Sequence, residues 1–330
     1  IAISSATQDI TIDALRIEQI GENEKDLLSA GAAISVVGWW TGYKIGGLIS
    51  LISADILQKQ GVENYWQISF LILSTIITLC SVGLLFIPEK DSKEKIKLQI
   101  LADQKIINKI GSSNNFVKIF AWFYNAVINP LLSFFKKNTL KVAFAILGFI
   151  FLFKIGEAFL GRMSLVFYKE IGFSKTDIAL YSKGIGWITT VMFTLLGGLF
   201  AVRMGLIKAM FVSGILMAST NVMFSILAWV GTSEILFAFT VLIDDLAAAF
   251  ATVAFVGFIS ALVDRNYTAT QYALLASIGT AGRTLFASSS GMMVDWLNGN
   301  WIIFFIITAL MVIPSLVCLF LIRKKLNLNE

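Results

Sequence analysis

Apolar residues occur along this chain in blocks of about 20, the length that an α-helix needs to cross the roughly 30 Å hydrocarbon core of a membrane. Short clusters of glycine, asparagine and charged residues separate the blocks. The pattern predicts a partial span at 1–18 and eight complete spans, at 30–53, 67–87, 140–163, 177–201, 206–229, 235–262, 270–294 and 301–322. We therefore expect an all-α protein that crosses a membrane several times.

The stretch between the third and fourth segments, residues 88–139, has a different character. Residues 88–109 are rich in lysine and poor in aromatic residues, which is typical of a solvated helix or a flexible linker. Residues 116–135 are apolar enough to be considered as a further span, but polar residues and a proline interrupt them. The interrupting residues are Lys118, Asn125, Asn129 and Pro130. We expect 116–135 to form an amphipathic helix on the cytoplasmic surface instead.

This linker divides the chain into three predicted parts: 1–87, 88–139 and 140–330. Six spans after a long basic linker are typical of the C-terminal half of a 6+6 transporter of the major facilitator type. The N-terminal part would then lack about three helices and part of a fourth. Since residue 1 is not methionine and 1–18 resembles the interior of a helix, we expect the chain to begin partway through a longer protein.

The composition excludes several classes of protein. Hydrophobic residues make up 57% of the 330 residues and the mean hydropathy is +0.81, while charged residues make up 14%, against about 25% in soluble domains. The two cysteines lie in apolar segments without a metal-site or disulfide spacing. Because the chain has no histidine, we expect neither a His-based metal site nor a Ser-His triad, and neither an enzyme nor a cofactor.

The basic residues predict the orientation of the spans. If the loop after the first segment is cytoplasmic, 18 of the 26 lysines and arginines are cytoplasmic, three lie on the opposite side and five lie within spans. The reverse orientation would place the richest loop outside, against the positive-inside rule. Membrane topology thus explains the net charge of +5 better than binding to nucleic acid does.

Two carboxylates in the first segment, Asp9 and Asp13, are four residues apart and so share a helix face. Carboxylates that share a low-dielectric cavity repel each other and can hold a proton between them near neutral pH. Both are candidates for proton coupling, and the neighbouring Gln8 is a candidate for substrate binding. The alternative for Asp13 is a structural ion pair with Arg16, one turn further along.

Further charged residues lie within predicted spans, where they are costly unless they face a cavity or a partner. Lys154 and Glu157, at i and i+3, form either a static pair or a pair that opens when substrate draws the lysine away and the glutamate takes a proton. The adjacent Asp244 and Asp245 point about 100° apart on a helix, so we expect one of them to face the cavity. The other would pair with a basic residue of a neighbouring span, and the candidates are Lys183 and Arg283.

The remaining candidates would bind a substrate. The guanidinium of Arg283 suits a peptide carboxylate, and Lys183 and Lys44 are similar cations. Trp39 and Tyr43 could stack on a sugar ring, although at least one tryptophan of the Trp39–Trp40 pair should serve packing, since neighbours in a helix point in different directions. The glycines at 38, 42 and 46 predict close helix packing.

Four segments resemble AmpG-type muropeptide permeases and occur in that family's order. Residues 5–18, SATQDITIDALRIE, resemble the family's fourth helix. The others are AGAAISVVG at 30–38, FKIGEAF at 153–159, and ATQYALL at 269–275 followed by Gly282 and Arg283. Residues 198–205, GLFAVRMG, resemble a major facilitator loop motif, with Val202 where an aspartate is usual.

The resemblance implies a multi-pass protein of the bacterial inner membrane and a monomeric, proton-driven symporter. Its cargo would be N-acetylglucosaminyl-1,6-anhydro-N-acetylmuramyl peptides, imported from the periplasm for cell-wall recycling. The same fourth-helix core resembles acetyl-CoA transporters, so another anionic solute is an alternative. A further alternative is an inactive, truncated paralogue.

Overall fold

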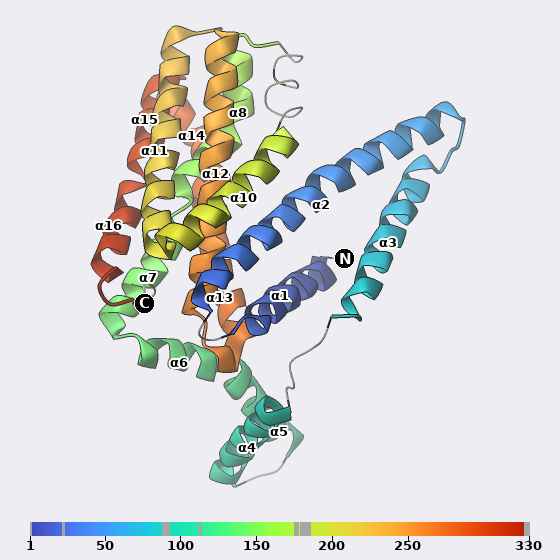
Figure 1. Ribbon diagram of the computed structural model, residues 1–330, viewed down its shortest axis with the longest axis vertical. Helices are drawn as coiled ribbons and strands as arrows, with labels where there is room; N and C mark the ends of the chain where they lie inside the picture. The colour runs from blue at the N-terminus through green and yellow to red at the C-terminus, as the bar shows by residue number, and fades with distance from the viewer. Residues whose placement is uncertain are drawn as a thin grey trace.

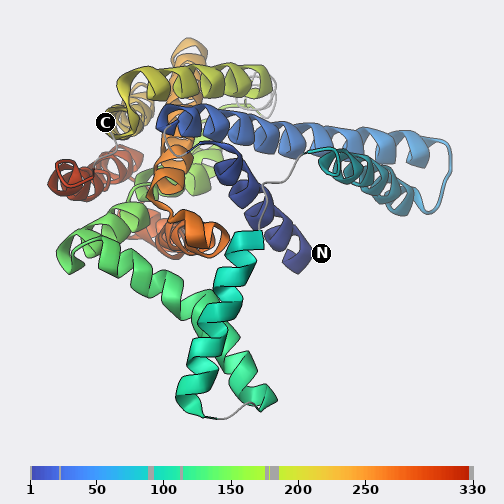
Figure 2. The ribbon, with the colours of Figure 1, turned by 60° about the horizontal axis from the view of Figure 1, so that its bottom comes forward.

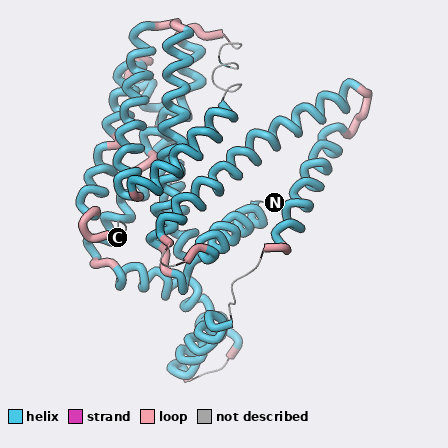
Figure 3. The backbone as a smooth tube through the Cα atoms, in the orientation of Figure 1, coloured by secondary structure: helices cyan, strands magenta, loops and turns pink. Residues whose placement is uncertain are grey.

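A computed structural model of the protein describes residues 2–21, 24–87, 93–111, 114–174, 178 and 186–326. In that part of the chain the regular structure is helical throughout (Figures 1 and 3). The first helices are α1 (Ala2–Gln19), α2 (Lys25–Lys59), α3 (Tyr65–Leu84), α4 (Lys93–Ile110), α5 (Asn115–Phe123), the π-helix η1 (Tyr124–Ile128) and α6 (Asn129–Lys137). The later ones are α7 (Leu140–Leu152), α8 (Ile155–Glu170), α10 (Gly186–Met204), α11 (Leu206–Val230), α12 (Glu234–Leu262), the 3₁₀ turn η3 (Arg265–Tyr267), α13 (Thr268–Ala287), α14 (Ser290–Trp296), α15 (Trp301–Leu310) and α16 (Ile313–Ile322).

Six helical stretches among the described residues are long and apolar enough to cross a membrane. They are Tyr65–Leu84, Leu140–Glu170, Trp187–Met204, Leu206–Val230, Glu234–Leu262 and Trp301–Ile322. Each overlaps a span that the sequence predicts, although the start of the predicted span 177–201 lies outside the described residues. The predicted spans 30–53 and 270–294 are helical too, but they are not in this set of six. The chain is therefore an all-α, multi-pass membrane protein.

Three of the predicted spans are interrupted, which the hydrophobic pattern did not indicate. The breaks fall at 153–154, 288–289 and 311–312. Pro314 follows the last break, and a proline there lacks the N–H donor that a continuous helix would need. At 288–289 both serine hydroxyls donate to carbonyls three residues earlier, a local bond that competes with the helical pattern. The break at 153–154 contains neither a proline nor a serine, and one of its two residues is the charged Lys154.

The central stretch is helical, with α4 and α5 packed against each other as a hairpin that projects from the rest of the molecule (Figure 2). The buried Asn125 side chain, in the π-helix that continues α5, donates to Asp103 of α4 over 2.6 Å. The predicted amphipathic helix at 116–135 corresponds to α5, η1 and α6, which form one helical run with a π-helical segment in its middle.

Most of the core lies within the bundle formed by α7 to α16, with contributions from α1, α2 and α6. One cluster of buried aromatic rings surrounds Phe149, which packs at 5.1 Å between ring centroids against both Phe153 and Phe258. A second cluster surrounds Phe167, whose ring lies 4.7 Å from that of Phe305. By contrast, α3 is almost wholly exposed, which suits a helix that faces lipid.

Helix α2 packs against α10 and α12 through its first half and then leans away from the bundle (Figure 1). Gly198 of α10 permits this contact, because a Cβ there would collide with the Cβ of Ala33. The predicted close packing at Gly38, Gly42 and Gly46 was wrong for the described residues, since a Cβ on any of these three meets open space. The glycine spacing along α2 therefore does not identify the face of α2 that is packed. The glycine that permits the contact, Gly198, lies on the neighbouring helix α10.

Candidate functional site

Two of the polar residues predicted in the spans, Asp9 and Asp13, lie where α1 meets α13 of the bundle. A groove of 550 Å³ runs between α1 and α13. Its α1 side carries both Asp9 and Asp13, which confirms that they share a helix face, as their spacing predicts. Its α13 side is formed mostly by small and hydroxyl-bearing residues: Tyr272, Ala273, Ala276, Ser277, Thr280, Ala281 and Thr284. Gln8 is exposed and does not line the groove.

The two carboxylates of this groove have different surroundings. Asp13 accepts from Arg16 Nη2 over 3.0 Å and from Ser35 Oγ over 3.3 Å. Arg16 Nη2 also donates to Ser260 Oγ of α12, over 3.0 Å. Among the residues that the structure describes, Asp9 makes no ion pair, and its side chain is exposed to the groove. The predicted structural pair of Asp13 and Arg16 therefore forms, and Asp9 is the carboxylate with access to solvent.

A second polar cluster lies at the break between α7 and α8. Lys154 is buried, with its Nζ 3.1 Å from Glu157 Oε2 and 2.7 Å from Thr252 Oγ1 of α12. Glu157 lies in the first turn of α8, where the partial positive charge of the helix N-terminus favours a carboxylate. The contact predicted between Lys154 and Glu157 thus forms, and Thr252 is a partner that the sequence did not indicate. The buried Lys154 ammonium therefore lies between two acceptors, and displacing it requires breaking both contacts.

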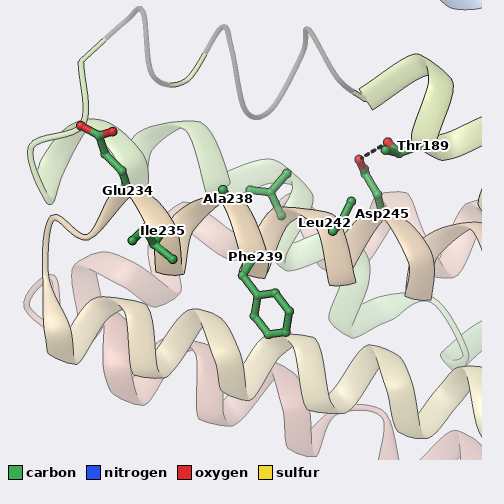
Figure 4. Close-up of a pocket in the computed structure, with 8 residues that line it drawn as sticks. Thr189, Glu234, Ile235, Ala238, Phe239, Leu242 and Asp245 are labelled. Atoms are coloured by element: carbon green, nitrogen blue, oxygen red, sulfur yellow. Dashed lines mark hydrogen bonds between the residues drawn. The ribbon is translucent and has the colours of Figure 1, made fainter.

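Asp244 and Asp245 on α12 point in different directions, as their adjacency predicts. Asp245 lines a pocket of 510 Å³ and accepts from Thr189 Oγ1 over 3.4 Å (Figure 4). Asp244 is not among the residues that line this pocket. Between Asp245 and Glu234, at the two ends of the pocket, the lining is apolar: Ile235, Ala238, Phe239, Val241 and Leu242.

The two basic partners predicted for these aspartates have different outcomes. Lys183 lies outside the described residues. Arg283 on α13 is exposed and forms no ion pair with Asp244 or Asp245 within the described part of the chain. Arg283 is instead one residue from Thr284 of the groove that Asp9 and Asp13 line, and its guanidinium is accessible.

The aromatic residues of α2 divide into a packed ring and an exposed pair. Trp40 packs against the core, with Lys44 Nζ 5.2 Å from its ring centre. Lys44 also donates to Thr190 Oγ1 of α10 over 3.3 Å. Trp39 and Tyr43 are exposed and stack on each other with parallel rings, 5.8 Å between centroids and 5° between planes. The expectation that the two tryptophans differ in role agrees with this geometry, and Lys44 lies on the packed side.

The sequence did not identify Arg265 as important, because it lies in a loop between spans and belongs to no recognisable motif. In the structure its guanidinium donates to carbonyl oxygens at the end of α1, namely those of Ile17, Ile20 and Gly21. Such a contact depends on how two distant segments meet. Local periodicity carries no signal for it.

Comparison with known proteins identifies relatives over nearly the whole chain. The chain is 32% identical over 323 residues to the putative transporter AmpG 4 of Rickettsia felis, which covers 98% of this chain and 70% of the relative. The chain belongs to the AmpG family. Another relative is the anhydromuropeptide permease of Escherichia coli, 28% identical over 329 residues, or 99% of this chain and 59% of that protein. No family model matches.

Membership of the AmpG family agrees with the resemblance in the sequence and with the six apolar helices. The relatives are named as transporters and permeases, so a small molecule is the substrate class that fits the AmpG family. The groove between α1 and α13 and the exposed aromatic pair on α2 are accessible features of this AmpG-family chain.

Proposed function

We propose that this protein is a proton-coupled permease of the bacterial inner membrane that imports 1,6-anhydromuropeptides for cell-wall recycling. One observation carries the proposal: a groove between α1 and α13 has two carboxylates on one wall, and among the described residues Asp13 pairs with an arginine whereas Asp9 forms no ion pair. The printed name of the Escherichia coli relative, an anhydromuropeptide permease, supports the substrate class.

The architecture we propose is a 6+6 major facilitator fold that works by alternating access. Residues 1–87 belong to one half, 140–330 form the other, and 88–139 link them on the cytoplasmic side. Helix α1 lies beside α13 and α2 lies beside α10 and α12, so the groove falls between the two halves. A site at such an interface can open to one side of the membrane at a time when the halves rock against each other.

Proton coupling is assigned first to Asp9. Its carboxylate is accessible in the groove and forms no ion pair with any described residue, so a proton can reach it and its charge state can change. Asp13 is held by Arg16 and is better suited to fixing the inner end of α1. Glu157 is a second candidate, because loss of its pair with Lys154 would free it to take a proton. Asp244 and Asp245 are alternative proton carriers on α12.

Substrate binding is assigned to groups with accessible faces. The stacked rings of Trp39 and Tyr43 present flat apolar surfaces that suit the C–H face of an amino-sugar. Arg283 presents a guanidinium that can bind a peptide carboxylate in a bidentate manner. Gln8 supplies amide hydrogen bonds from the exposed side of α1. Lys154, Lys44 and Lys183 are further candidate cations, the first two requiring their present partners to be displaced.

The test is uptake by the reconstituted protein. Proteoliposomes with an inward proton gradient should accumulate radiolabelled anhydromuropeptide, and a protonophore should prevent that accumulation. Uptake that is unaffected by the protonophore would reject coupling while keeping the substrate. Absence of uptake, together with accumulation of labelled acetyl-CoA or another anionic solute, would reject the substrate class.

A further inference from the structure

The loop between α12 and α13 contacts two distant parts of the chain, the end of α1 and helix α6. Arg265, in the η3 turn of this loop, donates to carbonyl oxygens of Ile17 (3.1 Å), Ile20 and Gly21 (3.2 Å) at the end of α1. The last carbonyls of an α-helix have no partner within the helix and carry its negative partial charge. Ile17 supplies one of these carbonyls, and Ile20 and Gly21 follow the helix directly, so Arg265 provides a hydrogen-bond donor and a positive charge at the α1 terminus.

Among the described residues, the hydrogen bonds of Arg265 to the α1 end go to backbone carbonyls and to no carboxylate. A guanidinium that binds carbonyls is attached less strongly than one that forms a bidentate pair with an acid, and here the arginine is half-buried rather than sealed from water. A residue that joins the two halves of a transporter only transiently needs hydrogen bonds of moderate strength. The geometry therefore suits a contact that forms and releases.

The same loop is joined to α6 by bonds of a different kind. Gln271 is buried, and its side-chain amide donates to the Pro130 carbonyl over 2.9 Å while its oxygen accepts from the Asp264 N–H over 2.7 Å. Ser133 Oγ donates to Asp264 Oδ2 over 2.9 Å. Breaking the Gln271 bonds would leave buried polar groups unpaired, which is costly. The hydrogen bonds between α6 and this region are thus more costly to break than those of Arg265 with the end of α1.

We infer that Arg265 is a positioning residue whose hydrogen bonds hold the end of α1 against the bundle, a contact that we name the clasp. We also infer that α6 moves with the bundle as one body. The inference rests on the alternating access proposed above. Opening of the groove toward the linker side then requires Arg265 to leave the α1 carbonyls, while the α6 contacts remain. A second contact between α1 and the bundle, that of Arg16 with Ser260 of α12, breaks in the same motion.

The position of Ser29 offers a direct reporter for this opening. Ser29, near the start of α2, is 1% exposed, and its Cα would lie 3.6 Å from a Cβ on Gly257 of α12. Closure of the linker side therefore shields it from reagents. In a background with Cys80 and Cys318 replaced by serine, Ser29→Cys would be the single thiol, and its reaction with a membrane-impermeant maleimide reports opening without any substrate.

Three variants of this reporter protein test the clasp. Arg265→Ala should raise the labelling rate about tenfold, the size expected when charge-assisted hydrogen bonds are lost. Arg265→Lys, which keeps the charge but not the fork, should restore part of the protection. Arg323→Ala, which removes an exposed arginine that stacks on Phe320, is the matched control and should leave the rate unchanged. Equal rates for Arg265→Ala and the control would overturn the clasp.

Cross-linking tests the second part of the inference. A short bifunctional maleimide across Ser133→Cys and Asp264→Cys joins α6 to the loop, and uptake should continue. The same reagent across Gly21→Cys and Arg265→Cys joins α1 to the loop, and uptake should fall to background. Loss of uptake in the first pair alone would show that α6 must separate from the bundle. Since labelling of Ser29→Cys needs no transported substrate, failure of the clasp is distinguishable from failure of the proposed cargo.

Discussion

Asp13 and Arg16 form an ion pair of 3.0 Å one turn apart on α1, and the same arginine nitrogen reaches Ser260 on α12. The carboxylate thus orients an arginine that joins the first helix to the bundle. This relationship separates the role of Asp13 from that of Asp9, although the two lie in the same groove.

Replacement of these two aspartates should have different effects on stability. Asp13→Asn removes the charge that balances Arg16, whose Nη1 is already buried without a partner in the described structure, so the melting temperature should fall by several degrees. Asp9→Asn should leave the melting temperature unchanged, because Asp9 has no ion pair among the described residues. Thermal unfolding in detergent measures both. Equal destabilisation by the two substitutions would contradict the assignment.

The Lys154–Glu157 pair should show strong coupling in stability. Removing one partner, by Lys154→Met or Glu157→Gln, leaves the other uncompensated in a buried site and should cost about 3–5 kcal/mol. The double variant should cost clearly less than the sum of the two single changes. A double-mutant cycle from denaturant unfolding provides the coupling energy. Simple additivity would show that the 3.1 Å contact contributes little.

Gly198 should tolerate a side chain only if Ala33 is made smaller. Gly198→Ala introduces a methyl group where the two Cβ atoms would collide, so it should separate α2 from α10 and lower the melting temperature. Adding Ala33→Gly should restore much of the loss. Gly38→Ala is the matched control, since its Cβ meets open space, and it should have no effect. A failure of the second substitution to compensate would rule out this helix contact.

The two tryptophans of α2 should differ in what their loss affects. Trp39→Ala removes an exposed ring stacked on Tyr43, so it should raise the KM for uptake without lowering stability. Trp40→Ala removes a ring packed against the bundle and should lower the melting temperature by several degrees. Uptake kinetics and thermal unfolding of both variants decide between a binding role and a packing role for Trp39.

The sequence was sufficient for features that depend on spacing along one helix. It predicted the apolar spans, the shared face of Asp9 and Asp13, and the contact of Lys154 with Glu157. Each of these follows from the length of an apolar block or from the 3.6-residue period.

Features that depend on which helices meet could not be predicted in this way. Thr252 and Thr190, which bind Lys154 and Lys44, come from separate spans about a hundred residues or more away along the chain. The same limit explains the wrong prediction for the glycines of α2. Their spacing marks one face of the helix, but only the crossing with α10 decides which face is packed, and there the small residue is Gly198.

Proton movement driven by the substrate tests the central claim most directly. Proteoliposomes in a weakly buffered medium, with no imposed gradient, should take up protons when unlabelled anhydromuropeptide is added outside. The external pH should therefore rise, and a protonophore should reverse the change. Asp9→Asn, with its fold intact by thermal unfolding, should give no pH change. Substrate uptake by the unaltered protein without any rise in external pH would contradict proton-coupled transport.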